Sequence, residues 1–294
     1  MQLSLEHLAR HYRIAKRNKF RVSDVDPADT GKFKSRAKAT ELLQRSVELL
    51  REFQEKLYAQ DTWALLLLFQ GMDAAGKDST IKHVMSGVNP QGCEVTSFKA
   101  PSSRELDHDF LWRATEALPE RGRIGIFNRS YYEEVLVVRV HPEFLAAQKL
   151  PSRLVSRDIW KDRYHDIRAF ERYLSRNGVV IRKFFLHISK EEQRKRFLQR
   201  LDEPEKNWKF SAADVTERNY WQKYMDAYEA MIQHTSTKHS PWYVVPADNK
   251  WFTHIVVASA IIDTLQSLNL RVPKLGKAKL KELAVARQAL LNER

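Results

Sequence analysis

Hydrophobic positions along the chain fall into short continuous runs separated by segments with helical spacing. The continuous runs predict five strands: TWALLLLFQ (62–70), CEVTSF (93–98), RIGIFN (123–128), VVIRKFFLHI (179–188) and WYVVPA (242–247). A run without polar positions, such as Ala64 to Phe69, is typical of a strand buried on both faces. That is the usual state of a strand in a parallel sheet.

Between these runs, apolar residues recur every three or four positions, which predicts helices. The predicted helices cover residues 37–59, 77–88, 103–118, 153–175, 190–201, 213–234 and 251–268, with one more after Gly276. Strands that alternate with helices are the signature of an α/β layered fold with a parallel sheet.

The two ends of the chain differ from its centre. Residues 1–36 are polar and basic without clear periodicity, and predict an arm laid over the surface or partly mobile. We expect one domain over residues 37–270 and a basic C-terminal tail over 271–294.

Composition narrows the class of protein. A hydrophobic share of 43% in 294 residues is ordinary for a globular core and excludes a disordered chain. The single cysteine, Cys93, excludes an internal disulfide and fits a reducing compartment. The longest apolar run is too short to cross a bilayer, and the N-terminus lacks a signal-peptide core. We therefore expect a cytoplasmic protein without a membrane partner.

The formal net charge of +13 predicts a polyanionic partner. Nucleic acid, an anionic membrane surface and a phosphate-rich substrate all fit this charge. A generic basic surface without a dedicated partner is the alternative.

The stretch GMDAAGKDST (71–80) has the spacing of a phosphate-binding loop between a buried strand and a helix. Backbone N–H groups and the helix dipole favour phosphate there, and Lys77 adds a positive charge. The Ser or Thr that usually follows this Lys to hold magnesium is replaced by Asp78, which we interpret as a first-turn helix residue rather than a ligand. Asp73 lies inside the loop, where it would repel phosphate unless a cation intervenes, so it predicts a magnesium ligand or a group that orients phosphate. The predicted phosphate-binding residues are Gly71, Ala74, Ala75, Gly76, Lys77, Asp78, Ser79 and Lys82.

A second stretch, IGIFNRSYYEEVLVVRVHP (124–142), follows the third predicted strand. Asn128 stands at the strand end, where phosphate-loop enzymes carry an acidic residue near magnesium. Arg129 follows, placed to meet phosphates bidentately. Glu133 and Glu134 would supply negative charge one turn later; their alternative role is that of helix-start acids.

A third stretch, HISKEEQRKRFLQRLDEPEKNWKFS (187–211), predicts a cationic helix. Arg196 and Arg200 are four residues apart and share one face, which Arg194 and Lys195 broaden. Phosphate-loop kinases keep a mobile lid at such a place. A solvated charged helix is the alternative.

Together these stretches resemble the polyphosphate kinase 2 family over roughly residues 25–270, in order and at similar spacing. The segments that carry the resemblance are GMDAAGKDST, FNRSYYEEVLVVRVHP, IRAFERYL, HISKEEQRKRFLQRLDEPEKNWKF and PWYVVPADNKWF. The form FNRSYYEE resembles the class III branch, which uses AMP as well as ADP, whereas other branches more often read FDRSWY. The resemblance implies a three-layer P-loop kinase fold with a central parallel sheet, similar to thymidylate kinases, and a helical lid at about residues 190–215.

The resemblance also implies a reaction: reversible, magnesium-dependent transfer of the terminal phosphate of inorganic polyphosphate to AMP or ADP, forming ADP and ATP. Mn²⁺ as a substitute metal, guanine nucleotides as further substrates and a homo-oligomer are implied as well. The residues that it implies for catalysis are Asp73, Lys77, Asn128, Arg129 and Glu133, with Asp73 and Asn128 at the metal. For the nucleotide they are Arg129, Glu134, Lys99 and Trp208, and for polyphosphate on the lid they are Arg194, Arg196 and Arg200.

Two rival functions remain. An ATP-dependent nucleoside monophosphate kinase shares the loop, lid and fold class, but the missing Ser or Thr and the Asn128–Arg129 strand end argue against it. A nucleic-acid-binding protein explains the charge but not the phosphate loop, so we expect no nucleic-acid partner.

Overall fold

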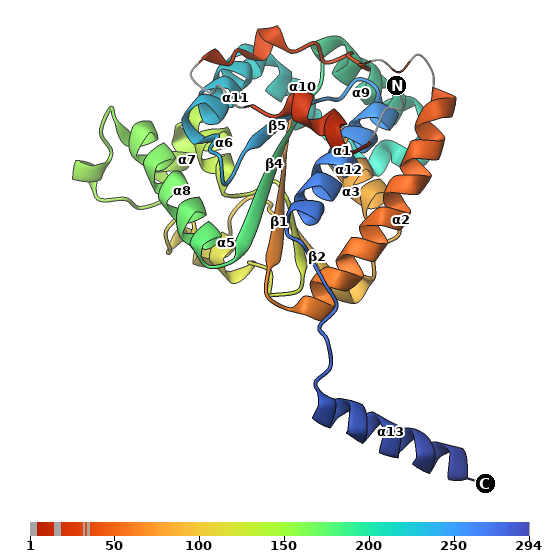
Figure 1. Ribbon diagram of the computed structural model, residues 1–294. Helices are drawn as coiled ribbons and strands as arrows, with labels where there is room; N and C mark the ends of the chain where they lie inside the picture. Colours follow the sequence, from red (N-terminus) through yellow and green to blue (C-terminus); the bar gives the residue numbers. More distant parts are fainter. Residues whose placement is uncertain (1–4, 15–18, 32, 34–35, 294) are drawn as a thin grey trace.

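Five parallel strands form one sheet at the centre of the computed structural model (Figure 1), which describes residues 5–14, 19–31, 33 and 36–293. The strands are β1 (Ala64–Gln70), β2 (Cys93–Ser97), β3 (Ile124–Asn128), β4 (Val179–His187) and β5 (Trp242–Pro246). Their order in the sheet is β2-β3-β1-β4-β5, and every pair is parallel. All of β1 is buried, because it lies in the middle of the sheet with helices over both faces. The predicted α/β fold with a parallel sheet is confirmed.

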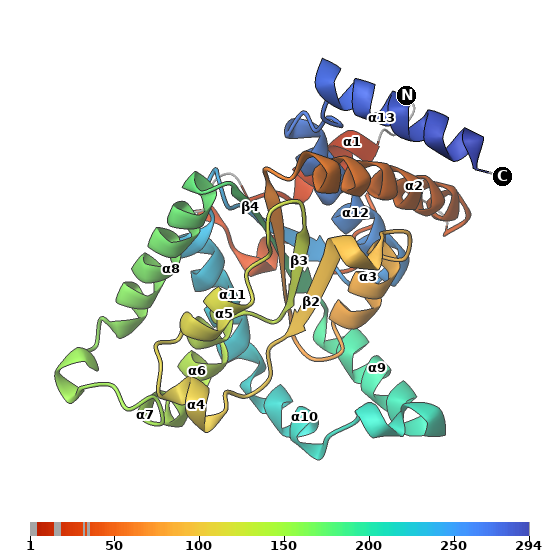
Figure 2. The same cartoon turned by 90° about the horizontal axis from the view of Figure 1, so that it is seen from below.

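Helices cover the sheet on both sides, which gives three layers (Figures 1 and 2). One face carries α2 (Arg36–Gln60), α3 (Lys77–Val84) and α12 (Lys250–Ser267), and the other carries α8 (Ile159–Arg176) and α11 (Trp221–Thr235). The other helices are α1 (Leu5–Leu8), α4 (Ser103–Leu106), α5 (Trp112–Glu116), α6 (Val137–Val140), α7 (Glu143–Ala146), α9 (Lys190–Asp202), α10 (Ala212–Glu217) and α13 (Lys277–Asn292). No described helix is both apolar enough and long enough to pass through a bilayer.

Four helix predictions were wrong in their extent. The segment 103–118 forms two short helices, because a capping box of Ser102 and Glu105 starts α4 and the Asp109 side chain accepts from Leu111 N after it. The segment 213–234 is divided by a 3₁₀ turn, η8 (Arg218–Tyr220). The helix predicted from residue 153 begins only at Ile159, and the one predicted to reach residue 88 ends at Val84.

The described part of the N-terminal arm lies against the domain. Tyr12, Phe20, Val22 and Phe33 are buried in the main hydrophobic core. Arg13 bridges Tyr243 in antiparallel fashion, and Ile14 N donates to Trp242 O at 2.9 Å. The arm therefore covers the exposed edge of β5, which would otherwise offer unpaired backbone groups to another chain. Lys16 and Arg17 of its basic run lie outside the described residues.

The C-terminal tail behaves differently. Residues 271–293 are exposed throughout, and α13 projects from the end of the molecule at which α12 ends (Figure 1).

A fully buried ion pair lies in the core beneath η5 (Tyr131–Val135), the 3₁₀ turn that follows β3. Lys183 Nζ donates to Glu171 Oε2 at 2.7 Å, to Tyr132 Oη at 2.9 Å and to Thr235 O at 2.9 Å. Glu171 Oε1 accepts from the hydroxyls of Tyr131 and Tyr132. Because all three ammonium protons are used, the pair ties η5 to α8, β4 and α11.

The variant Lys183→Met should lower stability by about 3–5 kcal/mol, because it leaves the Glu171 carboxylate buried without a cation. For a chain of this size, that corresponds to a fall of roughly 10 °C in the thermal midpoint. Adding Glu171→Gln should restore part of the loss, since a neutral amide oxygen can still accept from both tyrosines. Calorimetry of both variants measures this, with the exposed Lys195→Met as the matched control. Equal midpoints for Lys183→Met and the wild type would contradict the role of the pair.

Two histidine rings stack where α3 packs on α12. The ring centroids of His83 and His254 are 4.4 Å apart at an interplanar angle of 16°, and both Nε2 atoms are buried without a described partner. Burial, with the nearby His83 and Lys250, lowers the pKa of His254 to about 4, and burial also lowers the pKa of His83.

These histidines should make the protein sensitive to acid. The pKa of His254 in the folded state lies below its unfolded value of 6.5, so between pH 6.5 and about 4 the unfolded chain binds the extra proton. The free energy of unfolding that depends on neutral His254 is therefore fully present above pH 6.5. It is lost as the pH falls from 6.5 to about 4. The variant His254→Phe keeps the ring contact without the charge, so its thermal midpoint should fall less than that of the wild type between pH 7 and pH 5. Parallel pH profiles of the two proteins would argue against this titration.

Candidate active site at the carboxyl edge of the sheet

The carboxyl ends of the strands meet at one edge of the sheet, as parallel pairing requires, and this edge holds most of the predicted site residues. The loop 71–76 follows β1, and Asn128 and Arg129 follow β3. Asn128 pairs in register with Phe69, and Arg129 N donates to Phe69 O at 3.0 Å. The sheet register therefore brings the glycine-rich loop and the Asn128–Arg129 turn side by side.

The loop itself adopts a conformation that only certain residues permit. Gly71 has φ 156°, and a Cβ there would lie 2.8 Å from Leu186 O. Gly76 and Ala74 have φ values of 100° and 63°. Positive φ values are common in loops that bind anions through backbone N–H groups, so this conformation is compatible with the predicted phosphate binding.

Lys77 begins α3 directly after the loop and is buried. Its ammonium donates to Gly71 O at 2.7 Å and to Met72 O at 3.3 Å. Burial, reinforced by the charge of Arg129, lowers the pKa of Lys77 to about 8. Lys77 thus remains mostly cationic near neutral pH while its charge is held inside the loop.

Arg129 connects the loop to the turn after β3. Its guanidinium donates to Asp73 Oδ1 at 2.7 Å and to Glu133 Oε2 at 3.1 Å. These carboxylates raise the pKa of Arg129 further above its ordinary value. Its backbone has φ 63°, a costly conformation for a residue with a side chain, which the neighbouring β1 hydrogen bond and these two ion pairs hold in place.

Asn128 makes a separate contact with the start of α3. Its Nδ2 donates to Asp78 Oδ1 at 2.6 Å, so the exposed Asp78 side chain faces the end of β3. Two carboxylates, Asp73 and Asp78, therefore stand on either side of the Asn128–Arg129 turn. Among the described residues, no three His, Cys, Asp or Glu side chains gather as a metal site.

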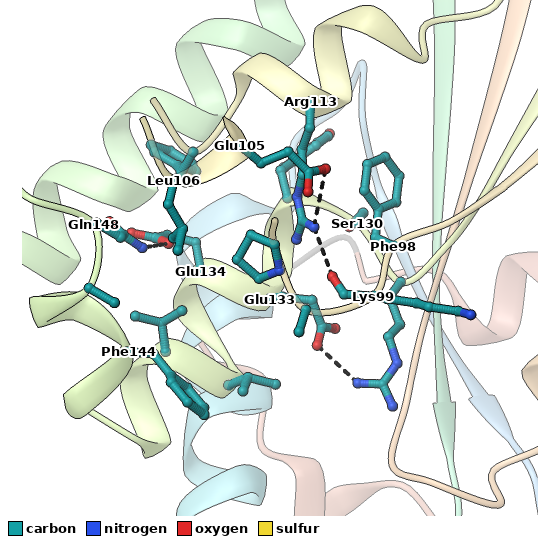
Figure 3. Close-up of a pocket in the computed structure, with 18 of the residues that line it drawn as sticks. Phe98, Lys99, Glu105, Leu106, Arg113, Ser130, Glu133, Glu134, Phe144 and Gln148 are labelled. Carbon is teal, nitrogen blue, oxygen red and sulfur yellow. Dashed lines mark hydrogen bonds and ion pairs between the residues drawn. The ribbon is translucent and has the colours of Figure 1, made fainter. Parts of the chain in front are cut away.

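Two cavities meet at this centre. The larger, of about 680 Å³, lies between η5 and the segment 98–113 (Figure 3). The second, of about 590 Å³, lies between the glycine-rich loop and the lid segment, which we define as residues 190–217. Asp73, Phe98, Lys99 and Arg129 line both, so the two cavities join at these four residues.

The wall of the larger cavity contains residues that sequence reasoning missed. Arg113 donates to Lys99 O at 2.8 Å, and its guanidinium lies 5.2 Å from the centre of the Phe98 ring. Apolar side chains line much of the rest: Pro101, Leu106, Phe110, Val137, Val138 and Phe144. The S-x-x-E pattern at Ser102–Glu105 was the one available signal, since it marks a short helix where a long one was predicted.

Glu134 and Glu133 face different surroundings although they are neighbours in sequence. Glu133 pairs with Arg129 at the centre, whereas Glu134 is buried and accepts from Arg163 Nε at 2.8 Å and Gln148 Nε2 at 2.6 Å. Burial raises the pKa of Glu134, although Arg163 opposes the shift. Figure 3 shows Glu134 beside Gln148, away from Glu133 and Lys99.

The lid segment brings some predicted cations to the site and not others. Arg200 lines the lid-side cavity, where it lies 4.0 Å from Asp214. Trp208 lines the same cavity and is 78% exposed, so the structure puts it beside the loop rather than in the larger cavity. Lys82 and Arg194 are exposed and line neither cavity.

Arg196 lines the lid-side cavity and is also bound to the backbone of the glycine-rich loop. Only 6% of it is exposed, and its donors reach the carbonyls of Ala74, Ala75, Ala247 and Asp248 and the Glu192 carboxylate. With these partners Arg196 holds the backbone of the glycine-rich loop against the end of β5. Its predicted contact with polyphosphate stays a prediction, because Arg196 lines the lid-side cavity while its donors bind the loop.

A family model, curated relatives and a solved structure all point to the same family. The family model described as Polyphosphate kinase 2 matches residues 32–273. An ADP-polyphosphate phosphotransferase of Rhodopseudomonas palustris is 54% identical over 94% of this chain and 99% of its own. An AMP/ADP-polyphosphate phosphotransferase of Meiothermus ruber is 44% identical over 90% and 95% of the two chains. The crystal structure of polyphosphate kinase 2 from Arthrobacter aurescens TC1 superposes with a TM-score of 0.86 at 40% identity, covering 95% of this chain and 96% of that one.

Replacing Arg196 should damage stability as well as the loop. The variant Arg196→Lys keeps the charge but cannot reach carbonyls on two segments at once, so a thermal midpoint at least roughly 5 °C lower is expected from the lost buried hydrogen bonds. The variant Arg200→Ala, on the partly exposed neighbour, should leave the midpoint nearly unchanged. Differential scanning calorimetry distinguishes the two. A thermal midpoint equal to that of the wild type for Arg196→Lys would contradict this structural role of Arg196.

Proposed function

The chain belongs to the polyphosphate kinase 2 family, and on this basis we propose that it transfers the terminal phosphate of inorganic polyphosphate to ADP and to AMP. One observation supports the proposal beyond family membership: two cavities of different character meet at Asp73, Lys99 and Arg129. Phosphoryl transfer needs a donor and an acceptor held in line, with cations around the moving group. The relatives are named for polyphosphate, so an ATP-dependent nucleoside monophosphate kinase is not favoured.

The larger cavity suits the nucleotide. Its apolar wall would receive the base, and Lys99, Arg113 and Arg129 lie where the phosphates of the acceptor would approach the loop. The lid-side cavity opens above the glycine-rich loop and is lined by Lys77, Arg200 and Lys250, which suits a polyphosphate chain. The net charge of +13 would attract such a polyanion from solution.

Each residue at the junction then has a task. Arg129 would neutralise charge on the transferred phosphoryl group, with its guanidinium oriented by Asp73 and Glu133. Lys77 would assist from inside the loop. An acceptor phosphate is already deprotonated near neutral pH, so no strong general base is required, and Asp73 would orient the attacking phosphate oxygen.

Magnesium fits the residues present. The predicted ligands Asp73 and Asn128 each keep one oxygen, Asp73 Oδ2 and Asn128 Oδ1, that accepts no hydrogen bond from the described residues. Asp78 Oδ2 accepts none either, so we add Asp78 as a further ligand, although the sequence pattern favoured a helix-start role for it. Mg²⁺ is commonly bound through one or two carboxylates together with substrate phosphates, so the absence of a larger carboxylate cluster among the described residues is compatible with it. Bound there, the ion would neutralise phosphate charge between donor and acceptor, and Mn²⁺ would substitute for it.

The proposal also covers further substrates, the location of the protein and its partners. Guanine nucleotides are proposed as additional acceptors, as a related GDP-polyphosphate phosphotransferase of Pseudomonas aeruginosa suggests. A cytoplasmic location, a homo-oligomeric state and the lack of a nucleic-acid partner remain predictions from sequence.

The decisive experiment supplies polyphosphate, Mg²⁺ and AMP without ATP and follows the nucleotides by chromatography. Formation of ADP and then ATP is expected. Conversion of ADP but not AMP would keep the family reaction and refute the AMP activity. Reaction only after ATP is added would refute the polyphosphate reaction itself.

Asp73→Asn tests whether this activity belongs to the proposed centre. Both members of the Asp73–Arg129 pair are about one-third exposed, so stability should change by less than about 1 kcal/mol. Turnover should fall by about 100-fold, because an oriented charge at the reacting phosphates is lost. Initial rates at saturating substrates, with the thermal midpoint as control, measure both effects. Near-normal turnover would remove Asp73 from the mechanism.

A further inference from the structure

Glu217 ends α10, the last helix of the lid segment, and its side chain reaches the wall of the larger cavity. Its Oε2 accepts from Tyr224 Oη at 2.8 Å and lies 3.0 Å from His141 Nε2. Tyr224 and His141 both line the larger cavity, and the His141 ring packs against Tyr220 with centroids 4.6 Å apart. The C-terminal end of the lid is therefore attached to the wall of the proposed nucleotide site.

The adjacent residue, Arg218, is attached in the opposite direction. Its guanidinium donates to Gln193 Oε1 at 2.6 Å and to Lys190 O at 3.2 Å, at the start of the lid. Gln193 Nε2 in turn donates to Asp73 O at 2.9 Å, inside the glycine-rich loop. Two neighbouring residues thus join the lid to the larger cavity on one side and to the loop on the other.

The part of the lid between these attachments forms one wall of the lid-side cavity. Arg200, Trp208 and Asp214 all line that cavity and lie between Lys190 and Glu217 in the chain. Any displacement of α10 that opens the lid-side cavity must move Glu217 relative to His141 and Tyr224. A nucleotide that fills the larger cavity would restrain this wall, and so would restrain Glu217.

We propose that Glu217 is a positioning residue that couples occupation of the nucleotide cavity to closure of the lid over polyphosphate. The proposal rests on the proposed function, because it assigns the two cavities to the two substrates. Coupling between two binding sites is reciprocal, so polyphosphate should also tighten the binding of the nucleotide. The Glu217 side chain is 31% exposed, and a contact of that exposure contributes little to overall stability. A role in coupling can therefore be separated from a role in folding.

Initial rates over a matrix of AMP and polyphosphate concentrations measure the coupling. A global fit gives the factor by which saturation with one substrate lowers the apparent KM for the other. For the wild type we expect a factor of at least about 5, at the lower end of typical site-to-site coupling. For Glu217→Ala we expect a factor near 1, because both hydrogen bonds are lost. For Glu217→Gln we expect a factor close to that of the wild type, since the amide oxygen can accept from Tyr224 and from His141.

Two further variants make the result specific. Tyr224→Phe removes one donor to Glu217 while keeping the aromatic ring, and should reduce the factor without a large change in the thermal midpoint. Glu48→Ala, at an exposed carboxylate on α2, should leave the factor and both KM values unchanged. If Glu217→Ala proves unstable, Tyr224→Phe carries the test alone.

The outcomes separate this proposal from the proposed function. A wild type that phosphorylates AMP from polyphosphate with a coupling factor of 1 overturns the proposal and leaves the function intact. The same conclusion follows if the Glu217→Ala and Tyr224→Phe variants keep the factor of the wild type. Absence of polyphosphate-dependent phosphorylation in the wild type would instead refute the function on which the proposal is built.

Discussion

The parallel pairing of β1 between β3 and β4 is the constraint on which the rest of the structure depends. Because the strands run in the same direction, the glycine-rich loop and the Asn128–Arg129 turn must emerge at the same edge. The register fixes their spacing, since Phe69 pairs with Asn128 one residue before Gln70 leads into the loop. Arg129 can then reach Asp73 across the short gap between two adjacent strand ends.

The charge at this edge contrasts with the charge of the whole chain. The protein carries a net charge of +13, yet Asp73, Asp78, Glu133 and Glu217 all line the two cavities that meet at this edge. Carboxylates beside phosphates are unfavourable unless each has a partner, and here Arg129 serves two of them while Asn128 serves a third. The basic surface would gather the polyanion, and the acidic centre would require that it arrive with cations. Such a division of charge would allow a loop that is proposed to hold phosphate to contain Asp73.

The sequence was sufficient for features that depend on local pattern. The apolar runs identified the five strands of the described residues, and the loop spacing was followed by the predicted order of strand, loop and helix. Features that depend on contacts between distant segments could not be predicted from the sequence. Arg196 looked like one of several lid cations, and only its bonds to the carbonyls of residues 74, 75, 247 and 248 show that it is buried against the backbone of the loop. The same holds for Arg113, whose place in the larger cavity follows from the break between α4 and α5.

The N-terminal arm lacked hydrophobic periodicity because its buried side chains enter the core one at a time rather than along one face of a helix.

Buried charge in this protein is concentrated around backbone that must hold an unusual shape. The Glu171–Lys183 pair lies under η5, and Arg196 binds the backbone of the loop that has positive φ angles at Ala74 and Gly76. Hydrophobic side chains could fill the same volumes at less cost in desolvation, but they do not bind particular carbonyls or hydroxyls. Arg196 fixes the direction of two loop carbonyls, those of Ala74 and Ala75, by donating to both. The same reasoning applies to Tyr131 and Tyr132, whose bonds to Glu171 fix the turn that carries Glu133 toward Arg129 and Glu134 toward Arg163. Buried charged groups thus fix, through their hydrogen bonds, the backbone conformation of η5 and of the glycine-rich loop. These two segments border the place where the two cavities meet.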